Sequence, residues 1–270
     1  MGVRYLMTPK TNLPSEANNS IETPNADFWN AYIVNMENKV FTEAFMQQFF
    51  TDGMRATHVR PDVASALENY FGGKSGGFTG SQFETLIKDS DPFVITAHDL
   101  IAITTLSVDV PARAMLWLLS DKGQREISEH LREIPDDIDI WDDRVADIFS
   151  DDGHVMKLWR ALGRANWPIP RPGGGLGGIT KRSKILVAKR PRLIPVLDRV
   201  VKGTLPESEN IWVSIQDVLR VDDYRTKLMD VLQHADVPDS VSLLRRLDVV
   251  IWKNNEKNFR RKTKPTTTSP

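Results

Sequence analysis

Cysteine is absent from the 270-residue chain. Without thiols the protein can hold no disulfide framework, thiolate zinc site or iron–sulfur cluster, and it has no catalytic thiol. Long apolar runs are absent as well. No stretch approaches the roughly 20 residues that span a bilayer, and residues 1–27 lack the apolar run of a secretory signal. We therefore expect a cytoplasmic protein that does not enter a membrane.

Metal and nucleotide motifs are missing too. The five histidines are scattered, and none has the spacing of a helical metal-ligand pair. The run Gly72-Gly73-Lys74-Ser75 ends like a phosphate-binding loop, but Glu68 stands where such a loop requires its first glycine. We therefore predict no metal and no cofactor, and we expect a flexible loop at this point.

Apolar residues recur at helical spacing along most of the chain, and strand signals are weak. Pro61 suits the first turn of a helix whose apolar face runs from Val63 to Tyr70. Thr96 and Asp99 have the spacing of a capping box, and Pro111 begins a further apolar helix. With 40% hydrophobic residues to bury, the sequence predicts an all-α fold with a sizeable core.

Composition divides the chain into four regions. Residues 1–25 are polar and rich in Pro and Asn, and residues 253–270 form a basic tail that ends in Pro and Thr. Such compositions predict disordered, flexible termini. Between them we expect a helical domain at residues 26–152 and a DNA-binding and catalytic region at residues 153–252, in a monomeric protein.

The net charge of −1 conceals two opposite segments. Residues 121–152 carry twelve acids against four bases, whereas residues 171–202 carry nine bases against a single acid, Asp198. A concentrated basic patch most commonly binds a phosphate backbone, so double-stranded DNA is the predicted partner. The acidic segment is interpreted as a solvated face; binding of a basic partner and masking of the basic patch are the alternatives.

The basic segment begins with a glycine turn at the start of a helix. A helix N-terminus offers unpaired backbone N–H groups that can bind phosphate, and neighbouring bases strengthen such a site. Contacts of this kind position a DNA backbone and read no sequence. The predicted DNA-binding residues are Gly177, Gly178, Thr180, Lys181, Arg182, Lys184, Lys189 and Arg190.

The order of residues across 176–202 resembles the helix-hairpin-helix DNA glycosylases. Four residues match the Leu-Pro-Gly-Val-Gly-x-x-Thr pattern of their hairpin, namely Leu176, Gly178, Ile179 and Ser183. After an apolar helix, Pro195-Val196-Leu197-Asp198 is similar to the Pro-Ile-Leu-Asp of the adenine-excising branch, which continues with a Val-Lys like Val201-Lys202. The chain departs from the pattern where the family has Pro, Gly and Ala, at Gly177, Thr180 and Lys184.

The resemblance implies a helical glycosylase bundle built around a helix-hairpin-helix motif, with Asp198 as the catalytic residue. A carboxylate near C1′ can stabilise the oxocarbenium-like sugar or orient the attacking water as a base departs. Arg182 stands where lyase-competent members carry a catalytic lysine, so a monofunctional enzyme is implied unless Lys181 takes that role. The alternatives for Asp198 are an ion pair with Arg199 or Arg192, or a helix cap.

A glycosylase extrudes its target nucleotide and holds the base between aromatic or apolar side chains. The candidate pocket residues, for each of which ordinary core packing is the alternative, are Tyr70, Phe71, Trp159 and Trp167. Two further pairs, Phe83-Glu84 and His98-Asp99, could add a second acid or a base to a site, although a helix face or a helix cap also explains them.

The sequence therefore favours a DNA glycosylase that excises a modified or non-standard base and leaves an abasic site. Divergence from housekeeping members suggests a role in defence against phage with modified DNA. Two other hypotheses stay open. One is a non-enzymatic DNA-binding protein that uses the hairpin for docking, and the other is an interaction protein whose acidic segment binds a basic partner.

Overall fold

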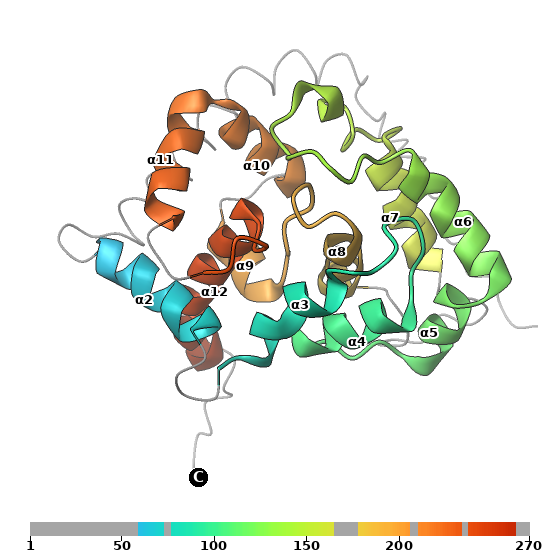
Figure 1. The fold of residues 1–270 in the computed structure, drawn as a ribbon, viewed down its shortest axis with the longest axis horizontal. Coiled ribbons are helices and arrows are strands. Elements are labelled where there is room, and N and C mark those ends of the chain that lie inside the picture. The colour runs from blue at the N-terminus through green and yellow to red at the C-terminus, as the bar shows by residue number, and fades with distance from the viewer. Residues whose placement is uncertain (1–58, 73–76, 165–177, 206–209, 234–236, 263–270) are drawn as a thin grey trace, which may run out of the picture.

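The computed structural model describes residues 59–72, 77–164, 178–205, 210–233 and 237–262. All regular structure in these ranges is helical (Figure 1), so the prediction of an all-α fold is confirmed. None of the described helices is long and apolar enough to cross a membrane. The N-terminal residues 1–25 and most of the glycine-rich loop, at 73–76, lie outside the described ranges.

The helices follow one another with short connections. In chain order they are α2 (Val59–Phe71), η2 (Thr79–Gln82), α3 (Phe83–Ile87), α4 (Ala97–Thr105), α5 (Ala112–Leu118), α6 (Asp121–Arg132), η3 (Asp143–Val145), α7 (His154–Arg164), α8 (Ile179–Lys189), α9 (Arg199–Thr204), α10 (Ile211–Arg220), α11 (Asp222–Leu232) and α12 (Leu243–Lys262).

Local sequence signals set several helix starts. At α4, the Thr96 hydroxyl accepts from the backbone N–H of Asp99, and the Asp99 carboxylate accepts from the backbone N–H of Thr96 at 2.6 Å, which confirms the capping box. Pro111 is the N-cap of α5. The apolar face of α2, from Val63 to Tyr70, is buried as predicted.

Helix α8 runs through the middle of the molecule, with α2 and α12 side by side on one flank and α6 and α7 on the other (Figure 1). Every residue of α8 from Ser183 to Lys189 is buried. The buried apolar side chains form one core cluster that draws on residues before and after position 152. The basic helix of the sequence is therefore largely an interior element.

Helix α12 extends through Lys262, past the point at which the sequence predicts a disordered tail. The disorder expected from residue 253 onward stays a prediction. Lys253 packs onto the protein, with its ammonium group 4.2 Å from the centre of the Phe78 ring. Lys, Glu and Arg are also good helix formers, so a charged composition does not oppose a helix here.

Candidate functional site

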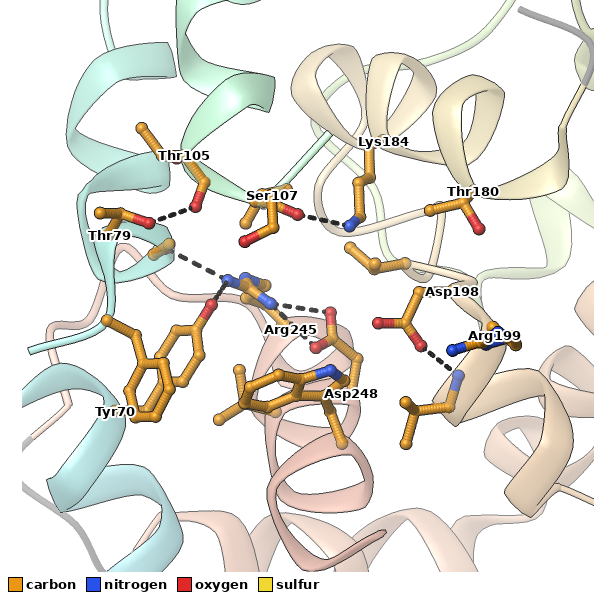
Figure 2. Close-up of a pocket in the computed structure, with 17 residues that line it drawn as sticks. Tyr70, Thr79, Thr105, Ser107, Thr180, Lys184, Asp198, Arg199, Arg245 and Asp248 are labelled. Atoms are coloured by element: carbon orange, nitrogen blue, oxygen red, sulfur yellow. Dashed lines mark hydrogen bonds and ion pairs between the residues drawn. The ribbon is translucent and has the colours of Figure 1, made fainter. Parts of the chain in front are cut away.

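Asp198 lines a cavity of about 280 Å³ (Figure 2). Its walls come from α2, η2, the C-terminal end of α4, the first turns of α8 and α9, and α12. Its volume is close to the lower end of the range for small-ligand pockets, about 300–1,000 Å³. The cavity can therefore be considered as a site for one compact molecule.

The Asp198 carboxylate is the N-cap of α9. Its Oδ1 accepts hydrogen bonds from the backbone N–H groups of Val200 and Val201 at 2.8 and 2.9 Å. Its other oxygen points across the cavity toward Arg245 and Asp248 (Figure 2). The helix-cap alternative is thus confirmed, and it leaves one oxygen of a rigidly held carboxylate facing the cavity.

Ser183 joins α8 to the segment that precedes Asp198. The fully buried Ser183 hydroxyl donates to the carbonyl of Leu197 at 3.2 Å and accepts from the Leu197 N–H at 3.3 Å. Because Leu197 is the residue before Asp198, these bonds fix the backbone from which the carboxylate projects. Ser183 thereby connects the hairpin part of the glycosylase-like sequence pattern to the Pro-Val-Leu-Asp part that ends at Asp198.

Arg245 of α12 forms the floor of the cavity with all five of its N–H groups engaged. Its Nε donates to Glu84 at 2.9 Å, and its Nη1 donates to both oxygens of Asp248 at 2.8 and 3.0 Å. Its Nη2 donates to the hydroxyl of Tyr70 at 2.8 Å and to the carbonyl of Gly80 at 3.2 Å. One guanidinium therefore orients groups from α2, η2, α3 and α12.

This buried cluster holds two carboxylates against one guanidinium. Arg245, Glu84 and Asp248 are each no more than 6% exposed. Burial raises the pKa of Asp248 to about 7, against the opposing effect of Arg245. Burial also raises the pKa of Glu84. Since a single guanidinium balances a single carboxylate, the second carboxylate is held in surroundings that favour its protonated form.

Lys184 brings an amine to the same cavity. Its Nζ donates to the carbonyl of Leu106 at 2.6 Å, at the C-terminal end of α4, and burial lowers the pKa of this amine. Ser107, the next residue, lines the cavity with a φ of 59°, in the left-handed region that a non-glycine residue rarely adopts. Within the described ranges, no group of three or more His, Asp or Glu side chains is placed to hold a metal ion.

Aromatic rings form one wall. Tyr70 and Phe78 stack with their ring centres 5.1 Å apart, and Trp252 meets both rings edge-on at 6.3 and 5.5 Å. Side chains of this kind offer flat apolar surface together with polar edges. The cavity thus combines an aromatic wall with the carboxylates of Asp198 and Asp248, an arrangement suited to a planar molecule that carries hydrogen-bonding groups.

The residues that line the cavity lie between Tyr70 and Trp252. The model of a family of unknown function, DUF6308, matches residues 63–255, which is more than half of the chain. The chain belongs to the DUF6308 family. A search of curated proteins and a search of solved structures found no match. The cavity of this DUF6308 protein is therefore formed entirely by the part that defines the family.

Of the four predicted pocket residues, the structure places Tyr70 in the cavity. Phe71 packs against the edge of Tyr70, with ring centres 4.9 Å apart, and does not line the cavity. Trp159 lies elsewhere, between Trp212 at 4.9 Å and the guanidinium of Arg182 at 4.3 Å. Phe71 and Trp159 therefore do not line this cavity, because both rings pack against other side chains, and Trp167 lies outside the described residues.

Three predicted DNA-binding side chains are interior. Lys184 donates to the carbonyl of Leu106 at the cavity, and Lys189 forms a buried ion pair with Asp99 at 2.5 Å. The guanidinium of Arg190, 2% exposed, donates to four backbone carbonyls, those of Pro92, Leu131, Ile134 and Lys189. Composition predicts these three bases at a DNA-binding surface, but the structure holds each of them in the interior on a buried partner.

The remaining bases of this DUF6308 protein lie closer to solvent. Gly178 is exposed at the N-cap of α8, and Thr180 and Lys181 follow it in partly exposed positions. Arg199 and Lys202 are exposed on α9. Arg192 pairs with Asp139 at 2.5 Å, so the acidic segment masks this base. Gly177 lies outside the described residues, and the guanidinium of Arg182 lies over the Trp159 ring at 4.3 Å.

Sequence reasoning missed Phe78, Arg245, Asp248 and Trp252. A signal for two of them exists, because Arg245 and Asp248 stand three residues apart between Leu243 and Ile251, a run whose other members, apart from Arg246, are apolar. Opposite charges at this spacing meet on one helix face, and charges in an apolar helix are buried only when paired. No comparable signal marks Phe78 and Trp252, which come together only through the packing of η2 against α12.

Proposed function

We propose that this protein is a DNA glycosylase that receives an extruded base in the Asp198 cavity, hydrolyses its N-glycosidic bond and leaves an abasic site. The observation that carries the proposal is the Asp198 carboxylate, which has one oxygen held by two backbone N–H groups and the other directed into an aromatic-walled cavity. A carboxylate beside C1′, with a flat apolar surface for the base, is what such a reaction requires.

In the proposed reaction, the C1′–N bond breaks and its electron pair leaves with the base. Positive charge then develops on the sugar, and the Asp198 carboxylate stabilises this charge without reorienting, because the N-terminus of α9 already fixes it. A water molecule adds to C1′ and passes its proton to Asp198. No cofactor takes part in this hydrolysis.

The order of elements supports a helix-hairpin-helix role for α8. A glycine, Gly178, caps α8, Ser183 on that helix binds the residue before Asp198, and Asp198 caps α9. We propose that the first turn of α8, with Lys181, holds the DNA backbone and that Lys202 on α9 adds a second phosphate contact. These positions flank the cavity, so a gripped strand would present its extruded nucleotide to Asp198.

The decisive variant is Asp198→Asn. Asparagine is as good an N-cap as aspartate, so α9 should remain intact while the charge is lost. We expect duplexes that carry assorted modified bases to develop alkali-labile sites with the wild-type protein, and the variant to be at least about 100-fold slower with unchanged DNA affinity. The control is Asp143→Asn, which removes an exposed acid that pairs with Arg220. Equal base release by Asp198→Asn would refute the proposal.

DNA docking is tested separately. The double variant Lys181→Glu, Lys202→Glu should weaken binding to every sequence alike and reduce its salt dependence. Lys227→Glu, on the exposed face of α11, is the matched control. If the protein binds DNA in this salt-dependent, sequence-independent way but releases no base from any duplex, its function is DNA binding and the glycosylase proposal fails.

A further inference from the structure

We propose that Asp248 is the proton donor of this site, delivering a proton to the departing base while Asp198 stabilises the sugar. The inference rests on the proposed glycosylase function and assigns a second, different role within the same cavity. It identifies the substrates that need this residue as neutral bases, which are poor leaving groups until they are protonated.

The position of Asp248 suits this role. It lines the cavity together with Tyr70 and Trp252, and its carboxylate faces that of Asp198 (Figure 2). It is 5% exposed, so solvent does not compete for its proton. Both of its oxygens accept from Nη1 of Arg245, at 2.8 and 3.0 Å, and this contact fixes the plane of the carboxyl group.

The charges around Asp248 favour a retained proton. The groups that face it are Tyr70 from α2, Glu84 from α3, Lys184 from α8, Asp198 from α9 and Arg245 on its own helix. Among them, Arg245 is shared by two carboxylates, and Oε2 of Glu84 is buried with no hydrogen-bond partner in the described structure. A pKa of about 7 leaves Asp248 protonated in a large fraction of molecules at neutral pH.

The step is balanced as a hydrolysis. The carboxyl proton of Asp248 passes to a ring nitrogen or exocyclic oxygen of the bound base, and the C1′–N bond breaks with its electron pair going to the base. Water then adds to C1′ and gives its proton to Asp198. Solvent returns a proton to Asp248 after the free base has left, so no oxidant, reductant or further reactant is needed.

Glu84 provides a matched control for the assignment. It binds the same guanidinium through Nε and is buried to the same extent, but it does not line the cavity. Glu84→Gln and Asp248→Asn each leave Arg245 with one carboxylate, so both variants should stay folded. A purely structural role would make the two variants equivalent. A proton-donor role makes Asp248→Asn much the more damaging, because Glu84→Gln removes a charge that helps Asp248 keep its proton but leaves the donor itself in place.

The test compares neutral and cationic leaving bases in single-turnover reactions. One set of duplexes carries hypoxanthine, uracil or N6-methyladenine, and the other carries N7-methylguanine, whose positive charge makes a proton donor unnecessary. We expect Asp248→Asn to slow release of neutral bases by about 100-fold or more and to change N7-methylguanine release by less than about 3-fold. Glu84→Gln should leave N7-methylguanine release close to that of the wild type and should slow release of neutral bases far less than Asp248→Asn does, while the exposed Asp143→Asn should leave both rates unchanged.

Other outcomes separate this inference from the proposed function. If Asp248→Asn slows both classes equally, or if the wild-type protein releases only N7-methylguanine, Asp248 is no proton donor although the glycosylase stands. If only neutral bases are released, the pH profile decides, because the wild-type rate should fall above about pH 7 and the remaining rate of Asp248→Asn should not. If no base of either class is released, the glycosylase proposal itself fails.

Discussion

Gly80 lies directly against the hydroxyl of Tyr70, such that a Cβ at position 80 would stand 2.1 Å from the hydroxyl oxygen. Gly80→Ala must displace Tyr70 from its hydrogen bond to Arg245, and we expect the free energy of unfolding to fall by about 1–3 kcal/mol. Chemical denaturation measures the change. Adding Tyr70→Phe should recover part of it, because removing the hydroxyl removes the clash.

A second glycine is the control for this prediction. Gly178 has no atom within 4 Å of an added Cβ, so Gly178→Ala should cost no more than about 1 kcal/mol, through a poorer helix cap. Equal losses for the two alanine variants would show that the contact between Gly80 and Tyr70 does not constrain the cavity.

Arg190 should be among the side chains on which stability depends most. Removing its guanidinium by Arg190→Met leaves four buried carbonyls without their donor, and we expect a loss of about 3–5 kcal/mol in thermal or denaturant unfolding. Arg190→Lys should not restore stability, because an ammonium cannot reach carbonyls on separate segments. Arg192→Met, which breaks an exposed ion pair with Asp139 and an exposed hydrogen bond to the carbonyl of Asp137, should cost less than about 1 kcal/mol.

Ser107 carries backbone strain at the edge of the cavity. Its φ of 59° suits glycine, which pays no Cβ penalty there. We expect Ser107→Gly to raise the free energy of unfolding by about 0.5–1 kcal/mol, whereas Ser107→Ala, which keeps the Cβ, should change it little. A glycine variant no more stable than the alanine variant would indicate that the turn after α4 relaxes to relieve the strain.

Asp248 should make stability depend on pH. Its pKa of about 7 in the folded protein lies above the ordinary value of 3.8, so folding favours the protonated carboxyl. Its contribution is complete below about pH 4 and is lost as the pH rises through 7. The difference in unfolding free energy between Asp248→Asn and wild type should therefore grow from pH 5 to pH 8, by about 1 kcal/mol or more.

Local features were predictable because they depend on neighbours in the chain. The capping box of Thr96 and Asp99 and the start of α5 at Pro111 need only a few residues of context, and the structure has both. The placement of Asp198 at the start of a helix after Pro-Val-Leu also follows from local sequence. Whether that carboxylate performs chemistry stays a prediction.

The burial of charge could not be predicted from composition. Lys189 and Arg190 count as surface charge when bases are simply summed along a segment, yet Asp99 and the carbonyls at the end of α6 hold them inside. The hydrogen bond of Arg245 to Tyr70 joins residues 175 positions apart. Contacts of this range depend on the packing of whole helices, which helical periodicity alone does not specify.

Arg245 lies in α12, and a ribosome completes α2, η2 and α3 long before it reaches that helix. The Tyr70 hydroxyl, the Gly80 carbonyl and Glu84 therefore lack their common hydrogen-bond donor until α12 has been made. The floor of the cavity can close only after residues 243–248 of α12 have emerged. A polypeptide that stops before residue 243 would have the Asp198 turn but no completed pocket, so translation through α12 is a precondition for any activity that the cavity supports.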